Sequence, residues 1–252
     1  AEGEYLRFVD SDDKIPFDST EKLYNIAKQY KAEIIQFEAG SFDKGIIDKT
    51  PLIKENCFFC IDSIAERKLL LMHPFLSNTH HLRFYDMEFV RKTNTRFAEN
   101  RIFEEPLFVY PMYFYIKRVM FLSEPYYQFR EHSESTMAKD SKSRLEDLPA
   151  VIWAVFGELK KRNFWETYHD EIEEFVLRNY YLLTFYNLSD ANMLSIKVFK
   201  EIQKNCIENF TDWRINPYIK GNNEKFYDGI EMDFSSMDEV VAYRNTLEWG
   251  HK

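Results

Sequence analysis

The first forty residues alternate between two kinds of pattern, and this alternation limits the fold more than any other feature of the chain. Residues 5–9 (YLRFV) form a short aromatic and β-branched run that ends in acids and then Pro16, as a strand entering a loop would. Residues 19–30 (STEKLYNIAKQY) begin with a Ser-Thr capping pair and carry apolar residues at helical spacing. Residues 32–40 (AEIIQFEAG) predict a second strand. This order predicts an α/β sheet, in which ligands bind beyond the carboxyl ends of the strands.

The rest of the chain divides into two parts. Residues 42–84 are irregular apart from a helix expected at 63–72, and a long aromatic helix is expected from near Glu104, followed by a closing strand at 121–129. From Lys139 onward, apolar spacings of three and four predict three helices, within residues 138–164, 166–188 and 192–210. We therefore predict an α/β core at residues 1–138 and a C-terminal helical annex at residues 139–252.

The composition narrows the class of protein. With 45% hydrophobic and 17% aromatic residues, the 252-residue chain has ample material for a buried core. Its formal charge of -9 argues against a nucleic-acid partner. Three cysteines provide no disulfide framework and suit a reducing compartment, so a cytoplasmic location is expected.

The sequence predicts no membrane span, because no run approaches the roughly 18 consecutive apolar residues that a span requires. Lys160, Lys161 and Arg162 could contact an anionic membrane surface, which would make the protein peripheral at the inner face of a membrane. A solvated helix end explains the same three charges.

An acidic segment follows the first expected strand. Asp10 and Asp12, with Asp13 beside them, offer hard oxygen ligands that suit Mg²⁺ or Mn²⁺. An Asp-x-Asp pair at the end of a strand can bridge such a metal to a diphosphate. A solvated acidic turn would have the same sequence, so both interpretations stay open.

A calcium loop is a second interpretation of this segment. The acids at its positions 1, 3, 9 and 12 would be Asp10, Asp12, Asp18 and Glu21. Two features oppose it, because Ile15 stands where the sharp turn needs Gly and Lys14 would face the cation.

A zinc site is a further candidate. Two cysteines in "CFFC" are followed by three histidines, the full set being Cys57, Cys60, His73, His80 and His81. The spacing is longer than that of a zinc finger, and cysteine is often a small buried hydrophobe.

Three stretches, in order, resemble motifs of the family 2 inverting glycosyltransferases with the GT-A fold. Residues 3–13 (GEYLRFVDSDD) resemble the metal-binding Asp-x-Asp segment, and residues 103–108 (FEEPLF) resemble the Glu-Asp motif that begins an acceptor-side helix. Residues 126–137 (YYQFREHSESTM) resemble the Tyr-x-Tyr-Arg and Ser-x-Thr segment. The resemblance covers residues 1–137 and implies a partial GT-A core with a Rossmann-like mixed sheet, followed by the helical annex.

The resemblance also implies roles for single residues. Asp10 and Asp12 would hold Mn²⁺ or Mg²⁺ against the phosphates of the donor, with His132 as a third metal ligand. Glu105 takes the place of the family's usual Asp and would be the catalytic general base, although an acid in a first helical turn beside Pro106 can be purely structural.

Three residues of the last motif are expected to contact the donor diphosphate: Arg130, His132 and Ser135. Arginine suits phosphate because its guanidinium stays charged and can bind with two hydrogen bonds. A surface loop in which Arg130 pairs with Glu131 or Glu134 is the alternative.

The resemblance implies a metal-dependent inverting glycosyltransferase, of the hexosyltransferase class, that moves a sugar from a nucleotide-sugar donor, with a UDP-sugar favoured. The acceptor would be a glycan or lipid-linked hydroxyl in surface polysaccharide or lipopolysaccharide synthesis.

Ala1 lies just before the Asp-x-Asp strand, so the family's N-terminal nucleotide-binding strands are expected to be missing. We then expect weak catalysis by this chain alone, and a homo-oligomer that covers the exposed sheet edge. The alternative is a noncatalytic GT-A fragment that acts as a protein-interaction module.

Overall fold

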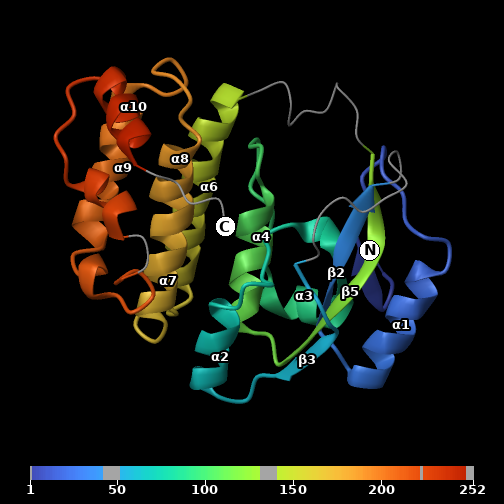
Figure 1. Cartoon of the computed structure of the whole chain (residues 1–252). Coiled ribbons are helices and arrows are strands. Elements are labelled where there is room, and N and C mark those ends of the chain that lie inside the picture. The colour runs from blue at the N-terminus through green and yellow to red at the C-terminus, as the bar shows by residue number, and fades with distance from the viewer. Residues whose placement is uncertain (1, 42–51, 131–140, 222–223, 248–252) are drawn as a thin grey trace. The chain divides into compact units, whose positions relative to one another are not determined.

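The computed structural model of the chain describes residues 2–41, 52–130, 141–221 and 224–247 (Figure 1). The chain divides into two compact units. Unit 1 comprises Ala1–Phe97 and Glu105–Ser135, and unit 2 comprises Ala98–Glu104 and Thr136–Lys252. Each unit is described by itself.

Unit 1 is built on a five-stranded mixed sheet. Its strands are β1 (Tyr5–Arg7), β2 (Ile34–Ser41), β3 (Cys57–Cys60), β4 (Arg83–Asp86) and β5 (Arg118–Phe129). They lie in the order β1-β4-β2-β5-β3, with β2 and β5 parallel and the other neighbouring pairs antiparallel. The predicted α/β class with a mixed sheet and a helical C-terminal region is therefore confirmed.

Helices cover both faces of this sheet. Helix α1 (Ser19–Tyr30) lies on one face, and the other carries α2 (Ile64–Leu71), α3 (Met87–Thr93) and α4 (Glu105–Val109) (Figure 1). Alternation along β2 explains the two layers: Ile35 and Phe37 pack in the core cluster that contains Leu23 and Ala27 of α1. Gln36, between them, points to the opposite layer.

A fully buried arginine organises that opposite layer. The guanidinium of Arg83, on β4, donates to Oε1 of Gln36 at 2.8 Å and to the hydroxyl of Tyr113. It also donates to the backbone carbonyls of Ser77 and Thr79. Because a buried guanidinium is costly unless its donors are paired, these bonds tie β4 to β2, to the 3-10 helix Tyr110–Phe114 and to the loop before β4.

The predicted start of the first helix is partly wrong. Helix α1 has the predicted bounds, but Asp18 is its N-cap residue and pairs with Lys22 at 2.7 Å instead of capping through its side chain. Ser19 is buried inside the helix, where its hydroxyl accepts a hydrogen bond from Arg7 at 2.8 Å. The Ser-Thr pair therefore serves the packing of β1 on α1 rather than a cap.

The prediction of one long aromatic helix from near Glu104 is also wrong. Helix α4 has five residues and passes into the 3-10 helix Tyr110–Phe114, after which the chain enters β5. Pro111 lacks the backbone N–H that an α-helix would need there. The apolar run that follows pairs as a strand with β2 and β3, so long-range pairing overrides the local helical pattern.

Unit 2 is helical. Its α-helices are α6 (Ser141–Lys161), α7 (His169–Val176), α8 (Leu183–Tyr186), α9 (Ile196–Asn209) and α10 (Met237–Thr246). A π-helix, Leu177–Leu182, joins α7 to α8 into one helical stretch, so the three helices predicted for this region are present. Short 3-10 helices complete the described structure at His80–Leu82 in unit 1 and at Trp213–Ile215, Glu224–Phe226 and Asp228–Ile230 in unit 2. Among the described residues, no helix is both long and apolar enough to cross a membrane.

Candidate functional site

The acidic segment forms a turn that is fastened to strand β5. The backbone N–H of Asp13 donates to the carbonyl of Asp10 at 3.1 Å, and Lys14 forms two backbone hydrogen bonds with Gln128, at 3.0 and 2.9 Å. The hydroxyl of Tyr127 accepts from the backbone N–H of Asp10 at 3.1 Å and donates to Oδ2 of Asp13 at 2.6 Å. The conformation of the turn is thus set by a strand that lies more than a hundred residues later in the chain.

These contacts give the three aspartates different roles. Oδ1 of Asp13 accepts from the backbone N–H of Arg130 at 2.8 Å, so both of its carboxylate oxygens bind β5. Burial, and then donation to Asp13, raises the pKa of Tyr127, which therefore stays a proton donor. Asp10 and Asp12 are exposed to solvent at the end of β1. Asp13 is consequently an anchor, and the exposed pair is the candidate for binding a cation.

Strand β1 is held by a second anchor just before this turn. Arg7 lies over the ring of Phe37, 5.2 Å from its centroid, and donates to the backbone carbonyl of Tyr126. Burial lowers the pKa of Arg7 to about 10, so it remains charged at neutral pH. Both ends of the segment that carries the acids are therefore attached to β5.

Glu105 begins helix α4 in a partly buried position. Its side chain is 24% exposed, and its Oε1 lies 3.6 Å from Nδ1 of His80. Burial raises the pKa of Glu105, whereas the interaction with His80, its own backbone N–H and the charge of His81 lower it. The net pKa lies below the ordinary value of a glutamate, so this carboxyl is ionised at neutral pH.

His81 connects the acidic turn with Glu105. Its ring is 9% exposed and lies against the ring of Tyr127, with 4.7 Å between the centroids. Burial and the charge of His80 lower the pKa of His81, whereas the charges of Asp10, Glu105 and Asp13 raise it. The ring of His80 lies 5.2 Å from that of His81, and His80 in turn contacts Glu105. The imidazole of His81 therefore lies between Tyr127, which binds the acidic turn, and the histidine that contacts the first residue of α4.

Part of the predicted site lies outside the described residues. His132 and Ser135 belong to residues 131–140, while the side chain of Arg130 is exposed. Within residues 2–41, 52–130, 141–221 and 224–247, no group of three or more His, Cys, Asp or Glu side chains is placed to hold a metal ion. The zinc alternative at Cys57 and Cys60, which lie on edge strand β3, therefore gains no support.

Three residues of this site were not assigned their roles from sequence: Tyr127, His80 and His81. Tyr127 lies inside the stretch that resembles the family's third motif, which was the available signal. The two histidines precede β4, and no local pattern links them to an acid on α4. Only the pairing of β4 between β1 and β2 brings them beside the acidic turn.

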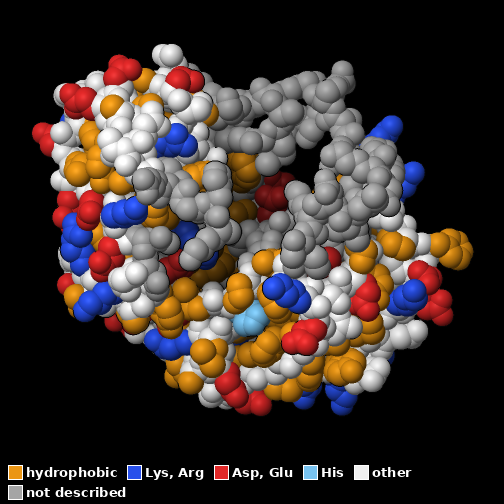
Figure 2. Space-filling view, viewed as in Figure 1, with side chains coloured by type: hydrophobic (Ala, Val, Ile, Leu, Met, Phe, Trp, Pro, Cys, Tyr) orange, Lys and Arg blue, Asp and Glu red, His pale blue; other side chains and the backbone are white. Residues whose placement is uncertain are grey.

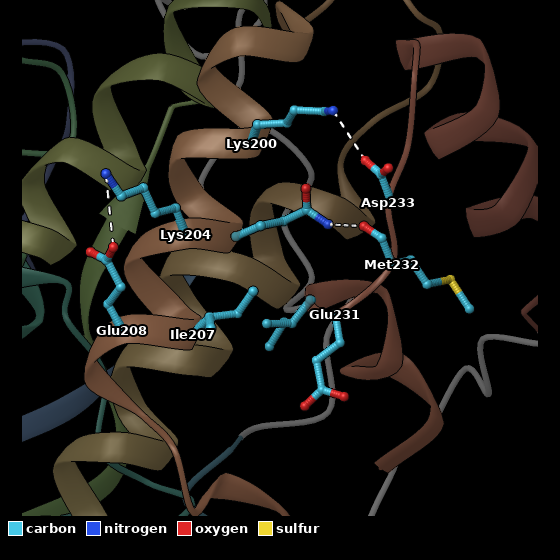
Figure 3. A pocket seen from close by; sticks show the side chains of 9 residues that line it. Lys200, Lys204, Ile207, Glu208, Glu231, Met232 and Asp233 are labelled. Carbon is cyan, nitrogen blue, oxygen red and sulfur yellow. Dashed lines mark hydrogen bonds and ion pairs between the residues drawn. The ribbon is translucent and has the colours of Figure 1, made fainter.

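Unit 2 contains a groove of about 350 Å³ along α9 (Figure 3). Four of its charged side chains form two ion pairs: Lys200 points to Asp233 at 3.2 Å, and Lys204 to Glu208 at 3.8 Å. The charges of these four side chains are therefore offset within the groove. The stronger candidate site is the one in unit 1.

On the face of the molecule drawn in Figure 2, the charged side chains of the described residues indicate no further binding surface. Figure 2 shows acidic and basic side chains interspersed rather than gathered by sign. Among the described residues on this face there is thus no extended basic patch of the kind that binds a nucleic-acid backbone.

Comparison with known proteins gives a likeness of fold. No protein-family model and no curated protein match the chain. A solved structure of S. aureus TarS 1-349 in complex with UDP-GlcNAc is similar with a TM-score of 0.53 and 15% sequence identity, over 83% of this chain and 58% of that chain. The complex of the same fragment with UDP has a TM-score of 0.48 and 14% identity, over 85% and 65%. The chain thus shares the fold of the TarS structure that holds UDP-GlcNAc, and it spans less than two thirds of the length of these structures.

Proposed function

We propose that unit 1 is the metal- and acceptor-binding half of an inverting glycosyltransferase of the family 2 GT-A type, which uses a nucleotide sugar, with a UDP-sugar favoured. The observation that carries this proposal is a run of contacts that leads from the turn of Asp10, through Tyr127, His81 and His80, to Glu105. The fold likeness to a TarS structure that holds UDP-GlcNAc supports the class of donor. The expected acceptor is a glycan or lipid-linked hydroxyl of a surface polysaccharide or lipopolysaccharide.

The exposed aspartates fit a small divalent cation. Mg²⁺, and Mn²⁺ like it, binds through one or two carboxylates while substrate phosphates and water supply the other oxygens, so Asp10 and Asp12 suffice on the protein side. A cation bound there would offset the charge that develops on the departing diphosphate. Arg130, whose side chain is exposed and whose backbone N–H binds Asp13, is the proposed diphosphate contact, together with His132 and Ser135.

Glu105 supplies the base. The carboxylate takes the proton of the acceptor hydroxyl as the oxygen of that hydroxyl forms its bond to the anomeric carbon. The bond from this carbon to the diphosphate oxygen breaks on the opposite side, so the anomeric configuration inverts. Because the pKa of Glu105 is lowered, the base is already ionised at neutral pH.

The test measures sugar transfer and nucleotide release by the full-length protein from a panel of UDP-sugars with Mn²⁺. Asp12→Asn should lower turnover on the order of 10²-fold, because a metal contributes several kcal/mol to stabilising the leaving group. Asp62→Asn is the matched control, since Asp62 is an exposed acid before α2. Equal turnover by the wild type and Asp12→Asn would remove the metal role.

The second candidate function is a noncatalytic interaction module. Calorimetry with UDP, GDP and CDP in the presence of Mn²⁺ separates the two functions. Binding of one nucleotide supports the enzyme, and no heat of binding with any of the three supports the module.

A further inference from the structure

Aromatic rings enclose His80 and pack against the helix that carries Glu105. Phe8 and Phe97 meet the His80 ring edge-on, with centroids 5.1 and 5.2 Å away. Phe97 in turn stacks on Phe108 at 4.2 Å and 11° between the ring planes. Phe108 lies on α4 together with Glu105, so the rings that restrict His80 also fix the helix that carries the acid.

The polar end of the histidine faces the carboxylate. Nδ1 of His80 is buried, and no group in the described part of the chain hydrogen-bonds to it. Oε1 of Glu105 lies 3.6 Å from this nitrogen, and the two side chains are 13% and 24% exposed. The backbone of His80 is fixed separately, because the hydroxyl of Tyr85 donates to its carbonyl at 3.1 Å. A short movement of Glu105 would complete a hydrogen bond that satisfies Nδ1.

The surrounding charges show why this contact matters. Burial alone would favour the protonated form of Glu105, and the interaction with His80 is the first of the effects that reverse this. The other titrating groups that face the pair are His81, which also lowers the pKa of Glu105, and Tyr85, which is buried and remains protonated. Asp10 and Asp13 act on His81 from the turn.

We propose that His80 is a positioning residue for the base Glu105. In the tautomer that carries its proton on Nδ1, His80 holds one carboxylate oxygen, and the other oxygen is directed to the acceptor hydroxyl. This inference rests on the proposed function, because the role of the pair is defined by the proton that Glu105 receives. His81 does not share the role, since its ring lies against Tyr127.

Two variants of His80 separate positioning from packing. His80→Phe keeps an aromatic ring against Phe8 and Phe97 but removes the donor, whereas His80→Asn places an amide N–H near the position of Nδ1. We expect His80→Phe to lose on the order of 10²-fold in kcat with little change in the KM for the donor, because small misplacements of a catalytic group cost that much. The acid limb of its kcat/KM profile should move to higher pH, and His80→Asn should recover most of the loss.

A purely structural role would lower the amount of folded protein without moving the acid limb. The inference is overturned if His80→Phe keeps the wild-type kcat, or if it keeps the wild-type acid limb.

A second measurement needs no turnover. ¹³C NMR titration of the Glu105 carboxyl should show a higher pKa in His80→Phe than in the wild type, because burial is then opposed by fewer interactions. If the wild type transfers no sugar, the proposed function fails, while a higher pKa still supports the coupling of His80 to Glu105. If the wild type is active and the titration is unchanged in His80→Phe, only the inference about His80 fails.

Discussion

Unit 1 and unit 2 each hold a glutamate in a buried or partly buried position, and the pKa values of the two side chains move in opposite directions. Burial by itself favours the protonated form of both Glu105 and Glu173. For Glu105, the imidazole of His80 and its other partners reverse the effect, and the pKa lies below the ordinary value. Glu173 is 1% exposed and accepts a hydrogen bond from the amide of Asn216 at 2.8 Å, and its pKa stays above the ordinary value. The chemistry of the partner, rather than burial as such, decides the direction in which the pKa of each acid moves.

The neighbours of Glu173 show what buried acids do in unit 2. Glu171, on the same helix α7, accepts from the hydroxyl of Tyr218 at 2.7 Å, and Glu174 pairs with Arg178 at 3.1 Å. Two of these contacts attach α7 to the segment around residues 216–218. The acids of α7 therefore hold a helix in place, whereas Glu105 is ionised and partly accessible, as a base must be.

The largest expected effect tests this contrast directly. Glu105→Gln keeps the size of the side chain and removes the base, so kcat for sugar transfer should fall about 10²- to 10⁴-fold. Glu173→Gln, the same substitution at the buried acid of unit 2, should leave kcat unchanged. Steady-state transfer assays on both variants, with circular dichroism to confirm the fold, provide the measurement. Full activity of Glu105→Gln would remove the base assignment.

The next effect compares two arginines and concerns stability. Arg83 is fully buried, and Arg83→Leu leaves several acceptors without a donor, Gln36 among them. We expect a loss of at least about 3 kcal/mol in the free energy of unfolding. Arg214→Leu in unit 2 removes exposed ion pairs to Asp228 and Glu231, and should cost less than about 1 kcal/mol. Urea titrations that give similar losses for both variants would contradict the contrast.

Local features of the fold could be predicted from sequence, because they depend on neighbouring residues. Short apolar runs predict strands β1 and β2, and apolar spacings of three and four predict α1 and the three main helices of unit 2. Strands β3 and β4 were not predicted, because each has four residues and is defined by pairing with distant strands. The order of the sheet depends on the same long-range pairing.

The candidate site divides in the same way. The position of Asp10 and Asp12 after a strand is visible in the sequence, since it depends on adjacent residues. The anchoring of Asp13 by Tyr127 joins residues 114 apart, and the contact of His80 with Glu105 depends on where β4 lies in the sheet. Such contacts have no local pattern, so sequence indicated the acids but not the groups that orient them.

The smallest expected effect is a gain in stability from Glu173→Gln. A carboxyl whose pKa is raised in the folded state contributes stability that is complete below the unfolded-state pKa and is lost as the pH rises through the folded-state pKa. Glutamine has no charge to bury and can still accept from Asn216, so the variant avoids this loss. The free energy of unfolding, measured near pH 4 and near pH 7, should differ little from that of the wild type in acid and should be about 1 kcal/mol higher at neutral pH.

Glu208→Gln is the control, because Glu208 is an exposed partner of Lys204 and its loss should change stability by less than about 0.5 kcal/mol. A neutral-pH gain for Glu208→Gln as large as that for Glu173→Gln would mean that net charge, rather than the buried carboxyl of α7, limits the stability of unit 2.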